Sequence, residues 1–246
     1  MIEERHQKIL DILSGRQFAS VSFLSNELFV SKPTIRRDLT YLQEKNLINR
    51  SYGGAMAKSY RNEVPIEFRN GIKIKEKTAL SKAAVKLIEH DDIVFIDSST
   101  TTLPIVSFLK ERKDITVITN GLQVLNALRN TNVRVYCVGG SMIQNSYAFV
   151  GKISERILEQ FSIDIMFFSS YSVSEAGIIS DYSEVETDTR RAALRQSRKK
   201  VFLCDNEKIG RNSAFIVTTT DKIDYFITNY KQPLNFKNKN LSLITV

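Results

Sequence analysis

The spacing of apolar residues in the first sixty positions predicts three short helices followed by a hairpin. The first helix is expected at about residues 3–14. The second begins after Ser20 and the third after Ser31, because a serine side chain can cap a helix N-terminus. Pro33 is tolerated in the first turn of the third helix, and residues 47–56 contain two glycines that predict the turn of a hairpin. The apolar stripes of the three helices are Ile9, Ile12 and Leu13, then Val21, Leu24 and Leu28, then Ile35, Leu39 and Leu42.

The third helix has a polar face that suits nucleic acid. At about 100° per residue, Arg37 projects opposite the apolar stripe with Thr40 beside it, and Arg36 and Thr34 flank it. A helix that enters the major groove needs apolar residues behind it, and guanidinium and hydroxyl groups in front for phosphates and base edges. A merely solvated face is the better interpretation of an isolated Arg-Arg pair. Three helices and a hairpin surround this pair, so the pattern indicates a winged helix-turn-helix that binds double-stranded DNA.

Strand-length apolar runs alternate with helical segments in the rest of the chain. After a helix near residues 74–88, the expected strands lie at residues 92–97, 115–119, 133–138, 163–168, 200–204, 223–228 and 241–246. This alternation predicts an α/β domain whose mostly parallel sheet is covered on both faces. We therefore expect a DNA-binding domain at residues 1–58, a connector at 59–73 that contains Pro65 and Gly71, and an α/β domain at 74–246.

Candidate binding residues follow four of these strands, where ligands gather in parallel sheets. The first strand leads into Asp97 and five hydroxyl residues at the start of a helix expected to run through Leu109. Such a turn favours an anion, although Ser and Thr also serve as ordinary caps. The other strands lead into Asn120-Gly121, Gly139-Gly140 and residues 205–208, where Lys208 supplies a mobile cation. Each of these could be a tight turn or a surface loop by itself, but their recurrence favours a binding site.

Composition and charge narrow the class of protein. The chain has 246 residues, 42% hydrophobic and 25% charged, with no apolar run of membrane-spanning length and an N-terminus too charged for a signal peptide. The formal charge of +8 suggests an anionic partner, but residues 1–60 hold only nine Lys/Arg against six Asp/Glu, so charge does not locate the partner. Cys137 and Cys204 are expected to be small buried hydrophobes in a cytoplasmic protein, and two histidines offer no material for a metal site.

One basic stretch, residues 189–200, has no role in this scheme. Arg190, Arg191 and Arg195 fit one face of a helix near residues 184–198, which we interpret as solvated. A second DNA contact there is the less favoured alternative.

The motif VSKPTIRRDLTYLQEKNLINRSYGGA resembles the N-terminal signature of the DeoR family of bacterial transcriptional regulators. Two positions depart from the family pattern: Asn46 stands where glycine is usual, and Tyr52 stands where histidine is usual. Asn tolerates a left-handed backbone, so the helix end should survive, whereas Tyr52 changes a contact of the wing. Pattern and resemblance together assign DNA contacts to Ser31, Lys32, Thr34, Arg36, Arg37, Thr40, Arg50, Tyr52, Gly53 and Gly54.

The second domain is similar, in order, to the effector domain of the same family. The similar segments are EKTALSKAA, FIDSSTTT, VITNGL, VGGSM, FVG, residues 175–177 and CDNEKIGR. The resemblance implies the fold of ribose-5-phosphate isomerase and binding of a phosphorylated sugar or related metabolite. It implies ligand contacts from Ser98, Ser99, Thr100, Thr101, Thr102, Asn120, Gly139, Gly140, Gly151, Asp205 and Lys208. Ser99 replaces a usual glycine and Tyr171 replaces a small residue, and both lie near the expected ligand.

These observations predict a sequence-specific DNA-binding regulator, without cofactor or metal. We expect a repressor of sugar or related carbon metabolism genes that is controlled by a phosphorylated sugar. A homodimer or higher homo-oligomer is expected, because two-fold DNA sites usually require one. The alternative is a sugar-phosphate isomerase with an appended helical domain, but Glu175 is the only carboxylate near the place of the isomerases' acidic cluster. RNA binding is less favoured, because side chains cannot read the narrow major groove of duplex RNA.

Overall fold

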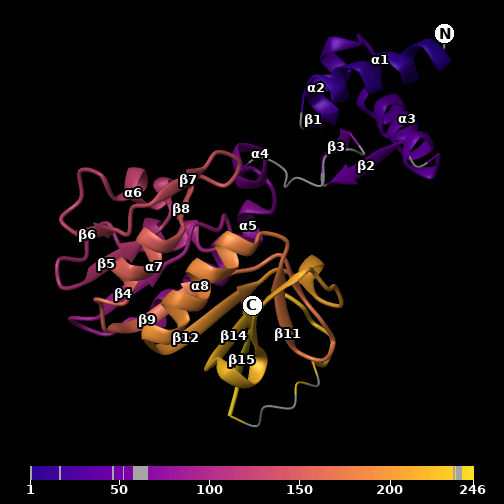
Figure 1. Ribbon diagram of the computed structural model, residues 1–246. Helices are drawn as coiled ribbons and strands as arrows, with labels where there is room; N and C mark the ends of the chain where they lie inside the picture. The colour runs from indigo at the N-terminus through magenta and orange to yellow at the C-terminus, as the bar shows by residue number, and fades with distance from the viewer. Residues whose placement is uncertain are drawn as a thin grey trace. The chain divides into compact units, whose positions relative to one another are not determined.

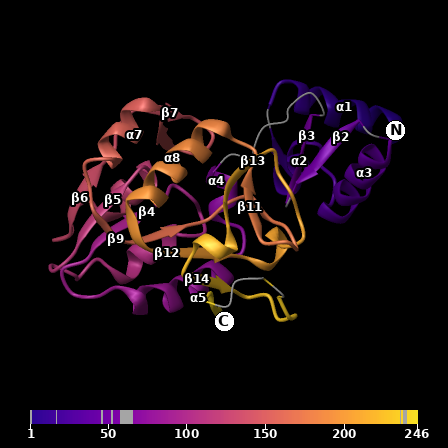
Figure 2. The same cartoon turned by 60° about the horizontal axis from the view of Figure 1, so that its bottom comes forward.

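The computed structural model describes residues 2–16, 18–45, 47–51, 53–57, 66–234, 236 and 240–246. The chain divides into two compact units, Met1–Ile72 (unit 1) and Lys73–Val246 (unit 2). Figures 1 and 2 show the elements of each. Among the described residues, no helix combines the length and apolar character that crossing a membrane requires.

Unit 1 is a three-helix cluster joined to a small sheet. Its elements are α1 (Ile2–Ser14), β1 (Ala19–Ser20), α2 (Val21–Glu27), α3 (Lys32–Glu44), β2 (Ile48–Ser51), β3 (Gly54–Ala57) and α4 (Ile66–Asn70). The side chain of Ser20 accepts a hydrogen bond from the backbone N–H of Phe23, and that of Ser31 accepts one from Thr34, so both predicted caps are confirmed. The apolar stripes meet in one core, which includes Ile9, Leu13, Leu24, Ile35, Leu39 and Leu42.

The hairpin of β2 and β3 gains a third strand. β1 pairs antiparallel with β3, which gives the order β1-β3-β2. Gly54 lies where this pairing brings backbones together: a Cβ there would lie 2.2 Å from the carbonyl oxygen of Ala19 and 2.5 Å from the ring of Phe18. Glycine is therefore required at position 54 by close packing. Asn46, Tyr52, Lys58 and residues 59–65 of the expected connector lie outside the described residues.

Unit 2 is built on a parallel sheet of seven strands, in the order β15-β14-β12-β9-β4-β5-β6. The strands are β4 (Ile93–Ile96), β5 (Thr116–Thr119), β6 (Arg134–Cys137), β9 (Ile163–Phe168), β12 (Ser197–Cys204), β14 (Tyr225–Thr228) and β15 (Ser242–Thr245). The helices are α5 (Ile74–Ala84), α6 (Leu122–Leu128), α7 (Lys152–Leu158) and α8 (Glu184–Gln196), with 3-10 turns η1 (Val85–Leu87), η2 (Leu103–Phe108), η3 (Asn206–Lys208) and η4 (Thr220–Lys222). The predicted α/β class with a parallel sheet is confirmed.

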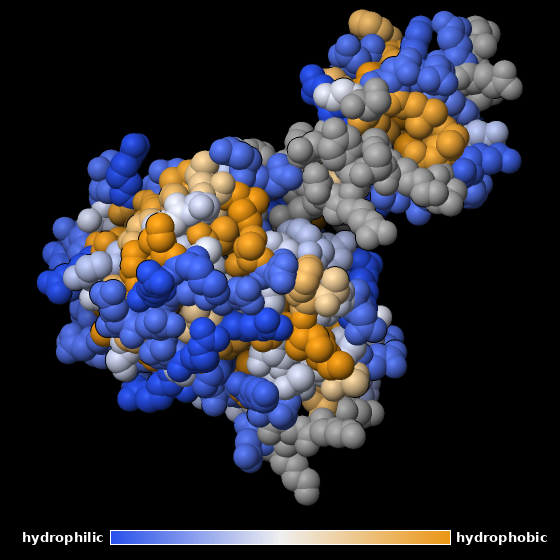
Figure 3. Space-filling view, in the orientation of Figure 1, coloured by the Kyte–Doolittle hydropathy of each residue, from blue (hydrophilic) through white to orange (hydrophobic). Residues whose placement is uncertain are grey.

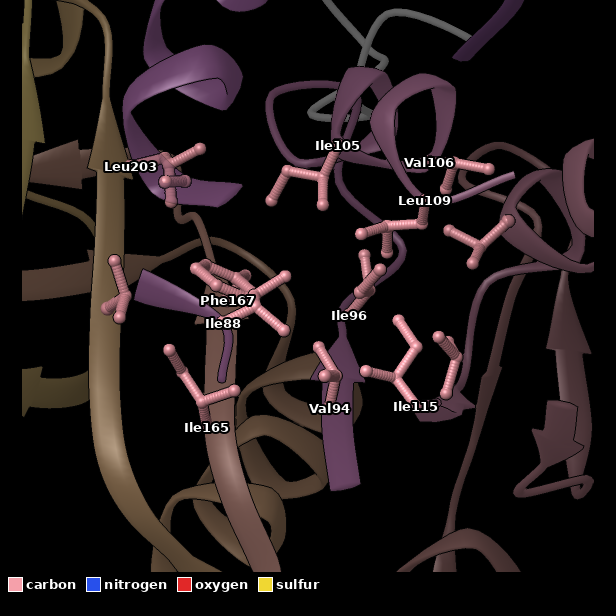
Figure 4. Packing of buried hydrophobic residues seen from close by; sticks show 14 of the residues in the cluster. Ile88, Val94, Ile96, Ile105, Val106, Leu109, Ile115, Ile165, Phe167 and Leu203 are labelled. Carbon is pink, nitrogen blue, oxygen red and sulfur yellow. The ribbon is translucent and has the colours of Figure 1, made fainter. Parts of the chain in front are cut away.

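Two cores lie on the two faces of this sheet, because successive strand residues point to opposite sides. Val94 and Ile96 pack on one face with residues of α5, η2 and α6. Figure 4 shows Ile105 and Leu109 of the η2 region over Ile96 and Phe167. Phe95, between Val94 and Ile96, packs on the other face with residues of α7 and α8. Hydrophilic residues cover much of the visible surface of both units, with apolar residues scattered among them (Figure 3).

Some features of unit 2 were absent from the sequence-based expectation. An antiparallel sheet joins β10 (Ser172–Val173), β11 (Ile178–Asp181) and β13 (Phe215–Thr219), and β7 (Ser141–Ile143) pairs with β8 (Ala148–Val150). The helix expected to run through Leu109 is the 3-10 helix η2, with Pro104 in its first turn. The expectation that Cys137 is buried is wrong, because β6 is the edge strand of the sheet and three of its four residues are exposed.

Candidate functional site

The outer face of α3 carries cations that are exposed to solvent. Lys32, Arg36 and Arg37 are exposed, together with Ser31 and Thr40, while Thr34 is half-buried. Among the described residues, neither Arg36 nor Arg37 has an ion-pair partner for its guanidinium. This face can therefore meet an external anion without first breaking internal contacts.

Hydrogen bonds fix the polar groups around these arginines. The hydroxyl of Thr40 donates to the backbone oxygen of Arg36 (2.9 Å), and Nη1 of Arg50, on β2, donates to the Thr40 hydroxyl (2.9 Å). The hydroxyls of Ser31 and Thr34 lie 2.9 Å apart in the first turn. The structure thus brings helix and wing residues together on one surface, with Gly53 exposed in the turn at φ 78° and Gly54 buried below it.

A buried carboxylate holds α3 in place, and sequence reasoning missed it. Asp38 accepts hydrogen bonds from Nε and Nη2 of Arg5 (2.6 and 2.8 Å) and lies 3.1 Å from Nε2 of His6. Burial alone would raise the pKa of Asp38, but the bonds from Arg5 and His6 outweigh it and hold that pKa below its ordinary value. The available signal was spacing, because Asp38 lies within the apolar stripe between Ile35 and Leu42.

In unit 2 the direction of the strand order reverses between β4 and β9. The chain starts at β4 in the middle of the sheet, continues outward through β5 and β6, and returns to β9 on the other side of β4 before β12. The carboxyl ends of the strands at such a reversal are where open parallel sheets bind ligands. The loop after β4 holds the hydroxyl-rich segment Asp97–Thr102.

Asp97 organises this loop from inside. Its side chain is fully buried, and Oδ1 accepts hydrogen bonds from the hydroxyls of Ser99 and Thr102, both at 2.7 Å. Its Oδ2 accepts from the backbone N–H of Ser169, just after β9, at 3.1 Å. Two of the five predicted hydroxyls are thus turned toward Asp97. Ser99, the departure from the family pattern, contributes to the loop's own hydrogen bonding.

The two hydroxyls between them are turned toward lysines. Nζ of Lys77, on α5, donates to the hydroxyl of Thr100 at 3.0 Å, and Lys77 is only 6% exposed. Nζ of Lys208 donates to the hydroxyls of Thr101 (3.0 Å) and Ser169 (2.9 Å). Two ammonium groups from distant parts of the chain therefore lie at adjacent threonines. Lys77 was not a predicted site residue, although its place in the buried stripe with Leu80, Ser81 and Ala84 could have revealed it.

Asp205 lies next to Lys208 at the end of β12. Its Oδ2 is 3.3 Å from Nζ of Lys208, and its Oδ1 is 3.7 Å from Nζ of Lys73. Burial would raise the pKa of Asp205, but the two ammonium groups outweigh it and keep the pKa below its ordinary value. The structure therefore brings together Thr100, Thr101, Asp205 and Lys208 as the sequence suggested.

Asn120 and the predicted glycines form a neighbouring group. The backbone oxygen of Asn120 accepts from the N–H of Phe149 at 2.7 Å, and its Nδ2 donates to the Phe149 oxygen at 3.3 Å. Its buried Oδ1 has no hydrogen-bond partner among the described residues. Gly140 has φ 104°, and a Cβ there would lie 2.6 Å from the Val150 oxygen, so this loop requires glycine. Gly139 lies beside it, and Gly151 is the N-cap residue that precedes α7.

Tyr171, the other departure from the family pattern, lies partly at the surface. Tyr171 is 50% exposed and its ring packs edge-on against Tyr182, with 5.1 Å between centroids. Glu175, the carboxylate considered for an isomerase, is exposed.

The expectation that Arg190 is solvated is wrong. Its side chain is 6% exposed and its three nitrogens contact the carboxylates of Asp97, Asp181 and Glu186 at 3.3, 2.9 and 3.1 Å. Burial would lower the pKa of Arg190, but the three carboxylates raise it overall. Arg190 thus connects the hydroxyl-rich loop to β11 and α8. Of the three partners only Asp97 is distant in sequence, and the tertiary fold that brings it to Arg190 could not be seen in the helical pattern.

The remaining basic residues of that stretch divide between two environments. Arg198 pairs with Asp164 and Lys199 with Glu89. Arg191, Arg195 and Lys200 line an open groove of about 410 Å³ together with Lys222, Leu194 and residues 216–219 of β13. This groove lies away from the carboxyl ends of the strands.

Comparison with known proteins gives matches along most of the chain. Residues 5–61 match the DeoR-like helix-turn-helix domain, and residues 72–230 match the DeoR C terminal sensor domain. The chain is 32% identical to the HTH-type transcriptional regulator GolR of Listeria innocua, over 93% of this chain and 91% of that protein. It is 27% identical to the Glycerol-3-phosphate regulon repressor of Escherichia coli, over 94% and 92% of the two chains.

Among solved structures, a D-ribose-5-phosphate isomerase in complex with phospho-erythronic acid matches 55% of this chain and 54% of that chain. The identity is 15% and the TM-score 0.42. The relatives of similar length are named as transcriptional regulators and repressors, which confirms the prediction of a DNA-binding regulator over that of an isomerase. The chain belongs to the DeoR family of transcriptional regulators.

Proposed function

We propose that this regulator is a repressor that binds operator DNA through the exposed face of α3 and its wing, and that a phosphorylated sugar bound in unit 2 releases it. The observation that carries the proposal is the pair of lysine–threonine contacts, Lys77 to Thr100 and Lys208 to Thr101. The relatives of this chain include a Listeria regulator and the Glycerol-3-phosphate regulon repressor of Escherichia coli. The name of the second relative points to phosphorylated small molecules.

The chemistry of the loop favours a phosphate. A phosphate group near pH 7 carries about −1.5 to −2 charges and three acceptor oxygens, which two ammonium groups and two hydroxyls can satisfy. Nζ of Lys77 donates to the hydroxyl of Thr100, and Nζ of Lys208, which also pairs with Asp205, donates to the hydroxyl of Thr101, so both ammonium groups lie at the loop. Ser169 adds a third hydroxyl next to Lys208. The bound anion would share these donors with Thr100 and Thr101.

The neighbouring group suits the rest of a sugar. Oδ1 of Asn120 is a buried acceptor without a partner among the described residues, and a sugar hydroxyl is the kind of donor that would satisfy it. No atom lies within 4 Å of where a Cβ would stand on Gly139 or Gly151, so a ligand can approach the backbone there closely. We therefore assign the phosphate to Thr100, Thr101, Lys77 and Lys208, and the sugar to the side of Asn120 and the glycines.

On the DNA side, we assign phosphate and base contacts to Lys32, Arg36 and Arg37, with Arg50 on the wing. The proposed division of the chain keeps residues 1–58 for DNA, 59–73 as connector and 74–246 for the effector. Repressors of this kind act on two-fold sites, so we propose that the working form is a homodimer or a higher homo-oligomer. The regulated genes would serve sugar or related carbon metabolism.

A thermal-shift screen of the full chain against sugar phosphates tests the effector proposal. A true effector at about 100 times its Kd should stabilise the protein by roughly 2.7 kcal/mol. Lys208→Ala and Thr101→Val should weaken binding of the same compound, whereas the matched surface variants Lys82→Ala and Thr78→Val should not, since Lys82 and Thr78 are exposed on α5. Equal responses of all five proteins would show that the phosphate does not lie at Thr101.

A further inference from the structure

Lys73 is the residue at which the chain enters unit 2, and its backbone is in an unusual conformation. Its φ is 54° and its ψ 43°, which is the left-handed region that side chains other than Gly, Asn and Asp rarely occupy. Its carbonyl oxygen accepts the backbone N–H of Lys77 at 3.0 Å, so Lys73 begins α5. Its own side chain makes no cap bond with the helix. The left-handed conformation must therefore be held by contacts elsewhere.

Those contacts come from the turn after β12. Nζ of Lys73 lies 3.0 Å from Oε1 of Glu207, 3.0 Å from Oδ1 of Asn206 and 3.7 Å from Oδ1 of Asp205. The Lys73 side chain is only 11% exposed in this position. Three acceptors on three consecutive residues thus fix one ammonium group, and with it the backbone at the start of α5.

Asp205 takes part both in the contacts that hold Lys73, which we call the Lys73 anchor, and in the proposed phosphate site. Its Oδ1 faces Lys73, while its Oδ2 lies 3.3 Å from Lys208, the lysine that donates to Thr101. Two ammonium groups on one carboxylate keep it ionised. Any anion that recruits Lys208 competes directly with Asp205 for the same cation.

We propose that Lys73 is a positioning residue that couples occupancy of the phosphate site to the backbone at the start of α5. The inference rests on the proposed function, because it requires an anion at Thr101 and Lys208. When phosphate binds, it takes Lys208 from Asp205 and repels that carboxylate. The 205–207 turn then shifts, and its hold on Lys73 changes.

Lys73 suits this role because its two backbone states are discrete. Left-handed and right-handed helical conformations are separate wells, so a residue leaves one by rotating fully into the other. Release of Lys73 would let it adopt the right-handed conformation of the residues that follow and redirect the chain entering α5. Coupling between sites needs such a two-state element, biased by the ligand. Residues 66–72, which precede Lys73, would be the first to move.

Hydrogen exchange of the full-length protein, with inorganic phosphate as the probe, tests this inference. Amides of residues 66–80 should change their exchange rates when phosphate is added at several times its Kd. Lys73→Gly removes the ammonium group and accepts positive φ without strain, so it should fold. The phosphate affinity of this variant should stay within about threefold of wild type, because Lys73 does not contact the proposed anion. The phosphate-dependent change in hydrogen exchange at residues 66–80 should be lost. Lys73→Arg should retain that change, and the control Lys75→Met, at an exposed lysine two residues on, should match wild type.

The outcomes separate the two proposals. If wild type shows no thermal shift with phosphate or any sugar phosphate, the proposed phosphate site fails, and this inference fails with it. If wild type binds phosphate but residues 66–80 do not respond, or Lys73→Gly responds as wild type does, the phosphate site stands and Lys73 does not transmit its occupancy. Glu207→Gln removes the carboxylate that pairs with Lys73 in the Lys73 anchor, so it should reproduce the effect of Lys73→Gly.

Discussion

The two units present their charged groups in opposite ways. In unit 1, Arg36 and Arg37 are exposed on α3 and have no internal ion-pair partner among the described residues. In unit 2, Lys77, Asp97 and Arg190 are buried and bound to other side chains. DNA is a long polyanion that meets a protein from outside, so exposed cations suffice for it. A small ligand is bound by contacts that are largely arranged beforehand, and the buried, mutually bonded groups of unit 2 fit the proposal that a ligand binds there.

The largest effect is expected when Arg190, the buried cation shared by three carboxylates of unit 2, is replaced. Arg190→Met should destabilise the protein by about 3–5 kcal/mol, because Asp97, Asp181 and Glu186 would remain buried without their common partner. Denaturant unfolding monitored in unit 2 measures it. Arg191→Met, at the next and partly exposed position of α8, is the control and should change stability by less than about 0.5 kcal/mol. If both variants changed the free energy of unfolding by similarly small amounts, the buried position of Arg190 would not be what makes it important for stability.

Asp38 is a buried carboxylate in unit 1, so it is an exception to the contrast between the two units. Asp38→Asn should cost about 2–3 kcal/mol, since it weakens two charge-assisted bonds from Arg5. The pKa of Asp38 is lowered in the folded state, so its contribution is present above the unfolded pKa of about 3.9 and is lost as pH falls through the folded value. Unfolding curves of wild type and variant should therefore converge below about pH 4. A gap that persists at acid pH would mean that charge is not the cause.

The exposed arginines should affect binding without affecting stability. Arg37→Ala should weaken operator binding by about 1–3 kcal/mol if it contacts a base, with reduced discrimination among sites. If it contacts phosphate alone, affinity should fall uniformly and the slope of log affinity against log salt should decrease by about one. Mobility-shift titrations at several salt concentrations distinguish the two. Unchanged affinity in both Arg36→Ala and Arg37→Ala would remove α3 as the DNA-contacting helix.

The smallest change in stability is expected at Phe29, whose side chain is exposed and whose backbone is strained. Phe29, between α2 and α3, has φ 54° and is 94% exposed. Phe29→Asn should stabilise the protein by about 1 kcal/mol, because Asn tolerates the left-handed region better. Thermal unfolding measures this gain, and operator binding measured on the same variant shows whether the ring contacts DNA. A loss of stability would mean that the ring is held by packing in solution.

Local sequence signals were sufficient where the elements depend on neighbours in the chain. Ser20 and Ser31 cap the helices that they were expected to cap, and Ile163–Phe168 forms the strand that its apolar run predicts. The positions of Thr100, Thr101 and Lys208 near one another followed from the rule that parallel strands end at one edge.

Signals that depend on distant partners were not available from the sequence. Arg190 was interpreted as solvated because the sequence does not show that Asp97, which lies 93 positions away, is brought to it by the fold. Lys77 and Asp38 both interrupt apolar stripes, yet a charge in a stripe does not say what it will bind. The small sheet of β10, β11 and β13 was missed because its strands are short and β13 lies far along the chain from β11.

The central place of β4 also has a consequence for synthesis on the ribosome. β4 pairs with β9, whose residues follow some seventy positions later, and β9 must emerge before the middle of the sheet can close. In unit 1, β3 pairs with β2, which directly precedes it, and with β1, and both separations are shorter than that between β4 and β9; contacts of shorter sequence separation form faster. Chains grow at about 5–20 residues per second and fold from the N-terminal domain onward. We therefore expect the DNA-binding fold to be complete during translation several seconds before the proposed effector site exists.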